Sequence, residues 1–447
     1  MHRSIFAIIL TLALCAAVLA EPSVSITVYN SNLALVRDVR NIGFKSGMNE
    51  ILFKDVSGQI DATSVHFNAS GVAMLEQNFD YDLVSSSKLI QKYIDHEIEV
   101  ISENGELTSG TLLTSDGQNI VLKQKDGTLR SILMESVAEI RYPELPEGLI
   151  TRPTLRWLVD SRSAADTETE VSYLTGGLSW RADYVLVIGE KPTDPADLSA
   201  WVTVNNNCGN SFKNAKLKLI AGEVNRAQQP TRRNMEKAVM YAEADLAGSG
   251  FEEKSFFEYH LYTLQRPTDL LNDQTKQVSL FPTTSINTKR IYDYDWRRKN
   301  DRVGVSIEFK NEKANGLGMA LPAGRVRIYQ EDTDGSEEFI GEDNIEHTPK
   351  DENIRVRTGE AFDIAVERLE KDYRRITDRV SERDYEIKLR NHKEETIEVV
   401  VVDYFYGDWD ITQSSHDYEK TSSRKAEFKV SVQPDKESVL TYTVRTQ

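Results

Sequence analysis

Apolar and polar residues alternate along much of this 447-residue chain. Successive side chains of a β-strand point to opposite faces, so a period of two predicts a strand with one buried face. The clearest case begins at Trp180, from which apolar residues occupy every second position up to Ile188. Similar short segments recur from residue 23 to the C-terminus, so the sequence predicts a mostly β protein.

Three of the predicted strands fall within residues 171–226, the stretch with the most regular pattern. Gly176 and Gly177 provide a turn before the first of these strands. The second strand is 201–204, and the third begins near Leu217 after a polar turn. No catalytic motif lies in this stretch, which therefore has the pattern of structural scaffold.

Residues 88–141 carry a different signal, a short helix followed by five brief strands. Helical spacing places Leu89, Ile90 and Tyr93 on one face, and Asn-Gly and Asp-Gly pairs supply tight turns between the strands. A helix followed by five short strands resembles the small barrels of the Sm and SH3 type, so we expect such a barrel here. The five expected strands are 97–101, 111–114, 120–123, 129–134 and 137–141.

The order of these segments predicts two β-sandwich domains, with the small barrel inserted in the first. We expect the N-terminal sandwich to comprise residues 21–87 and 142–226. Residues 227–255 break the alternation and predict a linker, within which a short amphipathic helix is an alternative. Residues 256–447 return to short strands with polar turns, as in an immunoglobulin-like sandwich. Within them, 361–375 suits a helix by composition, but its alternation of charged residues favours a strand.

Residues 1–20 have the features of a signal peptide. Arg3 gives a short basic start, and Ile5 to Leu14 form an apolar run interrupted by one threonine. That run is shorter than the roughly 20 residues of a membrane span. A lipid anchor at Cys15 is not expected, because Leu14 is large where a lipoprotein signal has a small residue. We therefore expect an exported protein of the periplasm or the extracellular space, with no transmembrane span in the mature chain.

The net charge of −17 argues against nucleic acid as a partner, because nucleic-acid binding needs clustered Lys and Arg. Loss of Arg3 with the signal peptide makes the charge −18. The expected barrel, 88–141, holds six basic and nine acidic residues, which makes RNA an unsuitable ligand for it as well. Cleavage also leaves Cys208 as the single cysteine, so no internal disulfide is expected. An incidental thiol is the favoured interpretation of Cys208.

Several segments carry a resemblance to a known family. The runs LTGGLSWRADY, WVTVNN and NAKLKLIAGEVNR resemble the signature of a bacterial secreted family, domain of unknown function 4139, which is related to the proteins called mucoidy inhibitor A. Further segments, such as DQTKQVSLF and GEAFDIAVER, extend the resemblance over most of the chain after residue 21. The family has no agreed activity, so the resemblance implies no catalytic residues. The signature positions are Gly176, Gly177, Trp180, Arg181, Asp183, Tyr184, Trp201, Asn205 and Gly222.

The most ligand-like segment is EDTDGSEE, residues 331–338. Alternating carboxylates before a glycine supply the hard oxygen ligands that calcium prefers, which makes Asp332, Asp334 and Glu337 candidate calcium ligands. The sequence of the segment does not match the complete EF-hand pattern. An Asp-Gly pair between two strands is also what a hairpin turn requires. We favour the hairpin, and we predict no cofactor other than calcium.

Other chemistry-bearing residues are scattered over the second half. Asp403, Asp408 and Asp410 flank Trp409, and a carboxylate pair beside a tryptophan could serve a glycosidase, although acids at a strand end are more often structural. Four histidines there lack the spacing of a two-histidine metal site. Aromatic rings are also frequent and would form a sugar-stacking or protein-binding surface if exposed, and core if buried. Besides Trp409, these rings are Tyr292, Tyr294, Trp296, Tyr404, Phe405 and Tyr406.

These observations lead to three hypotheses. The first is a non-catalytic envelope protein that binds a protein or glycan partner, or scaffolds an assembly, outside the cytoplasm. The second is an enzyme acting on an envelope polysaccharide or peptide, in which acids and aromatic rings meet in a cleft. The third is a calcium-stabilised adhesion module that uses the loop from Asp332 to Glu338. The absence of a catalytic motif from the sequence favours the first.

Overall fold

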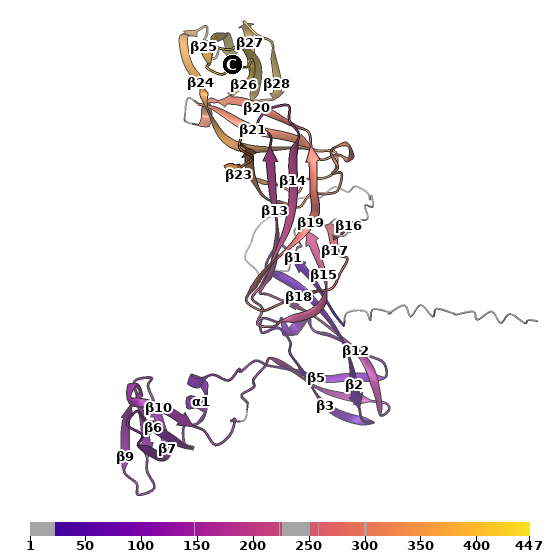
Figure 1. Cartoon of the computed structure of the whole chain (residues 1–447), viewed down its shortest axis with the longest axis vertical. Coiled ribbons are helices and arrows are strands. Elements are labelled where there is room, and N and C mark those ends of the chain that lie inside the picture. Colours follow the sequence, from indigo (N-terminus) through magenta and orange to yellow (C-terminus); the bar gives the residue numbers. More distant parts are fainter. Residues whose placement is uncertain (1–22, 147, 223, 226–250, 258, 299–301) are drawn as a thin grey trace, which may run out of the picture.

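The computed structural model describes residues 23–146, 148–222, 224–225, 251–257, 259–298 and 302–447. These residues form a mostly β, elongated molecule, with the C-terminal strands at one end and a small α1–β10 unit at the other (Figure 1). The predicted signal peptide, 1–20, lies outside the described residues. So does most of the predicted linker, 227–255, of which residues 251–255 belong to a strand. No helix among the described residues is long and apolar enough to cross a membrane.

The small unit follows the sequence prediction closely. Helix α1 (Ser86–Lys92) begins after Ser85, whose hydroxyl accepts a hydrogen bond from the Lys88 amide at 3.3 Å. Ile90 and Tyr93 of this segment pack on the sheet residues Ile98 and Leu122. The strands pair in the order β10-β6-β7-β8-β9, an open sheet, so the closed barrel is not confirmed. Their bounds are β6 (Glu97–Ser102), β7 (Leu107–Ser115), β8 (Asn119–Lys123), β9 (Leu129–Leu133) and β10 (Val137–Arg141).

The middle of the molecule is built from three sheets that share one core. The largest has the order β16-β17-β15-β1-β2-β12-β4 with β18 beside β15, and the smallest has the order β3-β11-β5. The third has the order β19-β14-β13-β22-β23. All three sheets turn alternate apolar residues inward, as the period of two predicts.

The bounds of the strands in the two sheets nearest the N-terminus are β1 (Val24–Tyr29), β2 (Leu33–Phe44), β3 (Gly47–Lys54), β4 (His66–Ala69), β5 (Val72–Asp80), β11 (Thr154–Ser161), β12 (Ala165–Thr175), β15 (Phe212–Ala221), β16 (Phe251–Phe256), β17 (Tyr259–Leu264) and β18 (Thr268–Leu270). Those of the five-stranded sheet are β13 (Leu178–Ile188), β14 (Ala196–Asn206), β19 (Gln274–Ile286), β22 (Gly324–Glu331) and β23 (Glu337–Ile345). Short 3-10 helices lie at Ala62–Ser64, Met134–Ser136, Trp296–Arg298 and Lys313–Asn315.

A nine-stranded sheet forms the C-terminal end and has the order β27-β30-β25-β24-β21-β20-β26-β29-β28. Residues 361–375 lie in β24, so the predicted strand is confirmed there. Most of the buried residues of this sheet form a second core, whereas Ile307 and Phe309 of β21 and Ile354 and Val356 of β24 belong to the first core. The bounds are β20 (Thr288–Asp295), β21 (Arg302–Lys310), β24 (Asn353–Arg375), β25 (Ser381–Asn391), β26 (Ile397–Tyr404), β27 (Trp409–Ser414), β28 (Tyr418–Ser422), β29 (Lys425–Val432) and β30 (Lys436–Thr446).

The hydrogen-bonded sheets cross the predicted domain boundary at 227–255. Strand β15 pairs with β17, β14 with β19, and β13 runs parallel to β22, each pair joining strands from the two sides of that segment. The parallel pair matches Ala182 with Gly324, more than 140 residues away. The period of two reports which face of a strand is buried but not which strand lies beside it, so sequence spacing could not reveal these pairs.

Candidate functional site

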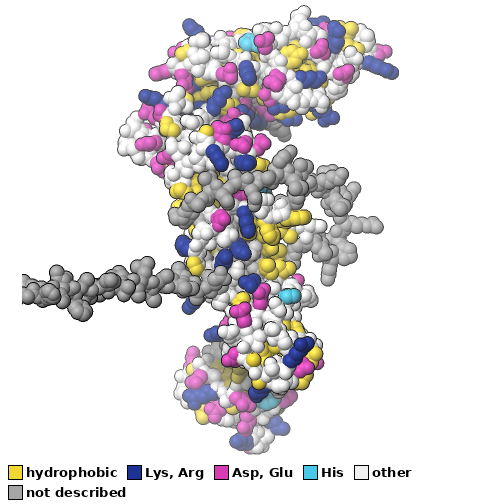
Figure 2. Space-filling model, turned by 90° about the vertical axis from the view of Figure 1, so that its right-hand side faces the viewer, with side chains coloured by type: hydrophobic (Ala, Val, Ile, Leu, Met, Phe, Trp, Pro, Cys, Tyr) yellow, Lys and Arg dark blue, Asp and Glu magenta, His cyan; other side chains and the backbone are white. Residues whose placement is uncertain are grey.

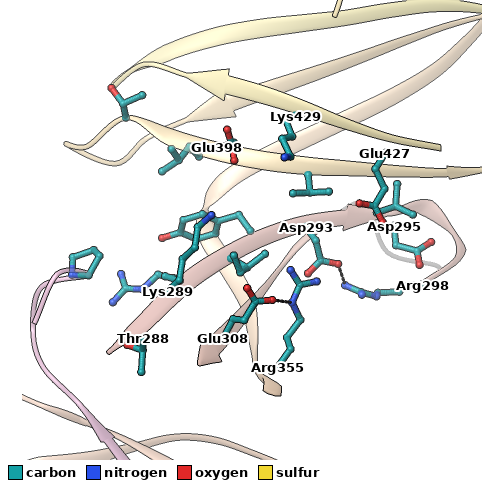
Figure 3. A pocket seen from close by; sticks show the side chains of 18 of the residues that line it. Thr288, Lys289, Asp293, Asp295, Arg298, Glu308, Arg355, Glu398, Glu427 and Lys429 are labelled. Atoms are coloured by element: carbon teal, nitrogen blue, oxygen red, sulfur yellow. Dashed lines mark ion pairs between the residues drawn. The ribbon is translucent and has the colours of Figure 1, made fainter. Parts of the chain in front are cut away.

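A cavity of about 470 Å³ opens on one face of the nine-stranded sheet. We call it the charged groove. Most of its lining residues come from β20, β21, β26 and β29, and the others are Pro192, Arg298, Arg355, Glu395 and Thr396. Figure 3 shows Glu398, Lys429 and Glu427 on one side of the space and Asp293, Arg298 and Glu308 on the other.

The strand register explains how the groove is built. Across the three neighbouring strands β20, β26 and β29, Asp293, Val400 and Lys429 form one row of register partners. Two residues further along each strand, Asp295, Val402 and Glu427 form a second row. Neighbouring side chains in such rows are close enough to interact. The intervening residues of β26 point to the opposite face and enter the second core. The groove therefore has an apolar floor with charged side chains standing on it.

Some of the charges in the groove are paired and others are not. Arg298 bonds Asp293 at 2.6 Å, and Arg355 lies 3.4 Å from Glu308. Among the described residues, Lys289, Lys429 and Glu398 form no ion pair. Since six basic and six acidic residues line the cavity, its net charge is zero. The charged groove can thus engage a partner of mixed charge more readily than a polyanion.

Acidic and basic side chains are also interspersed over the face of the molecule that Figure 2 shows. A surface of mixed sign lacks the clustered Lys and Arg that nucleic acids need. The described residues contain no group of three or more His, Cys, Asp or Glu positioned to hold a metal ion. The charged groove offers a partner ion pairs, hydrogen bonds and apolar contact.

The signature residues of β13 and β14 divide between the two faces of their sheet. Trp180 and Tyr184 point inward and are buried, each donating a hydrogen bond to a backbone carbonyl. Arg181, Asp183 and Trp201 lie on the other face, where Asp183 is the register partner of Trp201. Trp201 is 40% exposed. The sequence resemblance thus combined core positions with a polar surface.

Asp183 is the centre of this polar surface. It is buried and accepts hydrogen bonds from Thr203 at 2.7 Å, Arg181 at 3.1 Å and Arg325 at 3.3 Å. Burial removes water and opposes the charge, but the hydrogen bond from Thr203 and the charge of Arg181 outweigh it. The pKa of the Asp183 carboxyl is therefore lowered from its ordinary value.

A substitution at Asp183 tests this balance. A carboxyl with a lowered pKa stabilises the fold at pH values above its unfolded pKa of about 3.9, and the contribution disappears as the pH falls through the folded value. We expect Asp183→Asn to cost about 1–2 kcal/mol of unfolding free energy at pH 6. That difference from the wild type should shrink in urea titrations at pH 3. A difference that stays constant with pH would contradict the assignment.

The remaining signature positions are structural. Gly222 has a φ of +123°, and a Cβ there would lie 2.6 Å from the Tyr259 ring. Asn205 accepts a hydrogen bond from the Thr275 hydroxyl at 2.7 Å across neighbouring strands. Gly176 and Gly177 connect β12 and β13, as the sequence predicts.

Asp332, Asp334 and Glu337 lie in the hairpin that connects β22 and β23. The amide of Asp332 donates to Ser336 at 2.8 Å, and Gly335 has a φ of +82°. The Asp334 carboxylate accepts from the Ser336 amide at 2.8 Å, and hydrogen bonding by the Ser336 side chain and by this amide lowers the pKa of Asp334. The favoured hairpin is confirmed. Calcium binding by the same carboxylates stays a prediction, which melting curves with calcium chloride and with a chelator would test.

The aspartates around Trp409 are not brought together. Asp403 is buried, whereas Asp408 and Asp410 are exposed at the start of β27. Asp403 bonds Arg368 at 3.0 Å and accepts a hydrogen bond from Tyr442. This is a buried structural cluster, and it does not offer the facing carboxylate pair of a glycosidase.

The aromatic rings named above divide by burial. Tyr292, Tyr294, Phe405 and Trp409 are buried in the second core, whereas Trp296 and Tyr406 are exposed. Tyr404 lines the charged groove. The rings are thus mostly core, and two tyrosines, Tyr292 and Tyr404, are among the lining of the candidate site.

The four histidines of the second half lie apart in the structure and make separate contacts. His260 bonds Glu253 at 2.7 Å, His347 accepts from the Ala323 amide at 3.0 Å, and His416 contacts the Ser415 hydroxyl at 2.9 Å. The amide of His392 donates to a backbone carbonyl. Cys208 is buried, and burial raises the pKa of its thiol, which suits an unreactive side chain.

Sequence reasoning did not find the charged groove. Its residues alternate with core positions in β20, β26 and β29, so each strand alone has the pattern of an ordinary half-buried strand. The signal that was present is the charge at Lys289, Asp293, Glu398 and Lys429, on the outward face of strands that are otherwise apolar.

Fold and groove together define an elongated, mostly β protein with an open polar groove in its C-terminal sheet. The chain belongs to the family described as Domain of unknown function (DUF4139), whose match covers residues 169–447. A search of the curated proteins found no match. The family predicted from the resemblance is thus confirmed, and the match includes every residue of the charged groove.

Proposed function

We propose that this protein is a non-catalytic binding module that docks a protein partner in the charged groove. The observation that carries the proposal is the groove itself, in which unpaired Lys289, Lys429 and Glu398 stand beside a floor of Ile291 and Val400. Burial of the apolar floor supplies affinity, and the unpaired charges select the partner. The fitting partner segment is apolar, with flanking carboxylates opposite the lysines and a cation opposite Glu398.

We also propose that the protein acts outside the cytoplasm, in the periplasm or the extracellular space. The support is the N-terminal sequence, in which a basic residue precedes an apolar run and a small-residue end. In this proposal the two cores are immunoglobulin-like sandwiches, and the 88–141 unit is an Sm- or SH3-like module inserted in the first. Kinship with mucoidy inhibitor A belongs to the same proposal.

Site-specific crosslinking in native cells tests the binding role. A photoreactive residue placed at Lys429 should give a discrete crosslinked protein, recovered through a tag at the C-terminus. The same residue at Lys436, which is exposed at the start of β30 outside the groove, should give none. Lys289→Glu should weaken recovery about tenfold, because it sets like charges opposite each other.

The crosslinking result can overturn the proposal in two ways. Crosslinks of equal yield at positions 429 and 436 would mean that the groove is not the docking surface. Absence of a product at position 429, in a variant that exports and melts normally, would remove the binding role. The enzyme hypothesis would then be tested with envelope polysaccharides and peptides as substrates.

A further inference from the structure

A second cavity, of about 270 Å³, lies where the two hydrophobic cores meet. Ile188 and Ile307 on its wall belong to the first core, whereas Tyr292 belongs to the second. In Figure 1 this is the level at which β20 and β21 reach the end of β13 and β14. Arg290 and Tyr292 lie on the face of β20 that borders this cavity. Lys289 and Asp293 alternate with them along the strand and point to the opposite face, which borders the charged groove.

Tyr292 gives the first sign of a ligand. It is only 5% exposed, and its hydroxyl has no hydrogen-bond partner among the described residues. Other buried tyrosines do have one, since Tyr184 donates to Pro322 at 2.8 Å and Tyr262 donates to Ala320 at 3.0 Å. A buried hydroxyl is normally satisfied, so an unpaired one beside a cavity indicates a missing partner.

Two cations line the same cavity. Arg290 and Lys393 form no ion pair among the described residues, and the Lys393 ammonium lies 5.9 Å from the centre of the Tyr292 ring. Glu360 is the single acid of the lining, and Arg302 engages its carboxylate at 3.3 Å. The cavity therefore offers unpaired donors and a net charge of +1.

This set of groups selects one chemical class. Arg290, Lys393 and the Tyr292 hydroxyl supply three donors and two positive charges, a set that favours an anionic oxygen. A net charge of +1 matches a monoanion, and the isoleucine walls require an apolar body next to it. We propose that the cavity between the two cores binds a small organic carboxylate, with its oxygens on Arg290, Lys393 and Tyr292 and its apolar part against Ile188 and Ile307.

Calorimetric titration of the full chain with hexanoate tests the proposal, with hexan-1-ol and N-acetyl-leucine as comparison ligands. Hexanoate should bind at pH 7 and hexan-1-ol should not. Arg290→Gln should weaken hexanoate about tenfold, because it removes a charge-assisted hydrogen bond. Lys289→Gln is the matched control, since it removes a cation from the adjacent residue on the other side of β20 and should leave the affinity within about twofold.

Tyr292→Phe separates a loss of binding from a loss of folding. It removes only the unpaired hydroxyl, so the variant should retain the wild-type melting temperature. It should weaken hexanoate by about threefold. Binding of N-acetyl-leucine in preference to hexanoate would assign the site to peptide C-termini, and the reverse to simple fatty carboxylates. The proposal is overturned if neither carboxylate binds, if hexan-1-ol binds equally well, or if Arg290→Gln and Lys289→Gln behave alike. Arg290 and Tyr292 also line the charged groove, so the Lys289→Gln control is what distinguishes binding in this cavity from binding in the groove.

Discussion

Arg368→Gln is expected to cost about 3–5 kcal/mol of unfolding free energy, as does removal of one partner from other buried ion pairs. Asp403 is 1% exposed, and Arg368 bonds its carboxylate at 3.0 Å. Burial disfavours the arginine charge, yet the Asp403 carboxylate outweighs it and raises the pKa of Arg368. The variant would leave a buried carboxylate held only by Tyr442 and the Tyr404 amide.

Urea titration of the variant at pH 7 measures the size of this loss. The matched control is Arg375→Gln, which breaks an exposed pair with Asp378 and should change stability by about 0.5 kcal/mol or less. Equal losses for the two arginines would contradict the role of the buried cluster.

The double variant Arg368→Met with Asp403→Asn separates charge from packing. Removing both charges leaves no uncompensated carboxylate, so the double variant should be more stable than Arg368→Gln. Arg368 also lies over the Tyr385 ring at 4.2 Å, and this packing contact is lost in both cases. A double variant no more stable than Arg368→Gln would assign the loss to packing.

The positions of the strands could be predicted because the alternation of apolar and polar residues within each strand identifies its buried face. The alternation at Trp180 places β13 within a few residues, and the alternation of charged residues across 361–375 identifies β24 despite its helix-like composition. The hairpin turn at Asp334-Gly335 could likewise be predicted from a few consecutive residues. In each case, the information lies within about ten consecutive residues.

The sites could not be predicted because they depend on which strands lie side by side. The charged groove needs β20, β26 and β29 in register, and these strands are separated by more than 100 residues of sequence at the widest. The same holds for Asp403, whose partner Arg368 lies on β24, and for the parallel pair of β13 and β22. The alternation of apolar and polar residues in a strand does not specify which other strand lies beside it in the sheet.

The two cavities depend on such strand neighbours. In β20, consecutive residues serve two separate cavities, with Lys289 in the charged groove and Arg290 in the lining of both. Lys289 thus lines the charged groove alone, whereas Arg290 lines both cavities. For that reason, the variants at 289 and 290 are informative as a pair.

Gly177→Ala is expected to destabilise the fold by about 3 kcal/mol or more, because the new methyl group meets backbone atoms that cannot move aside. Gly177 has a φ of +78°, and a Cβ there would lie 2.5 Å from the Cys208 Cα. The Gly177 carbonyl also accepts the Asn207 amide at 2.7 Å, and its own amide donates to Asn32 at 3.0 Å. Any shift that relieves the clash therefore disturbs the hydrogen bonds that join this turn to Asn207, after β14, and to Asn32, between β1 and β2.

Gly176→Ala is the matched control, one residue away in the same turn. Its nearest neighbour would be the Gln59 side-chain oxygen at 3.1 Å, the end of a flexible side chain, and its φ lies outside the left-handed region. We expect a change of about 1 kcal/mol or less. Chemical unfolding of both variants checks the difference. Gly177 lies beside Cys208 and Leu178, which belong to the first core. Equal stability of the two variants would therefore mean that this turn adapts to the methyl group and does not fix the register of the five-stranded sheet.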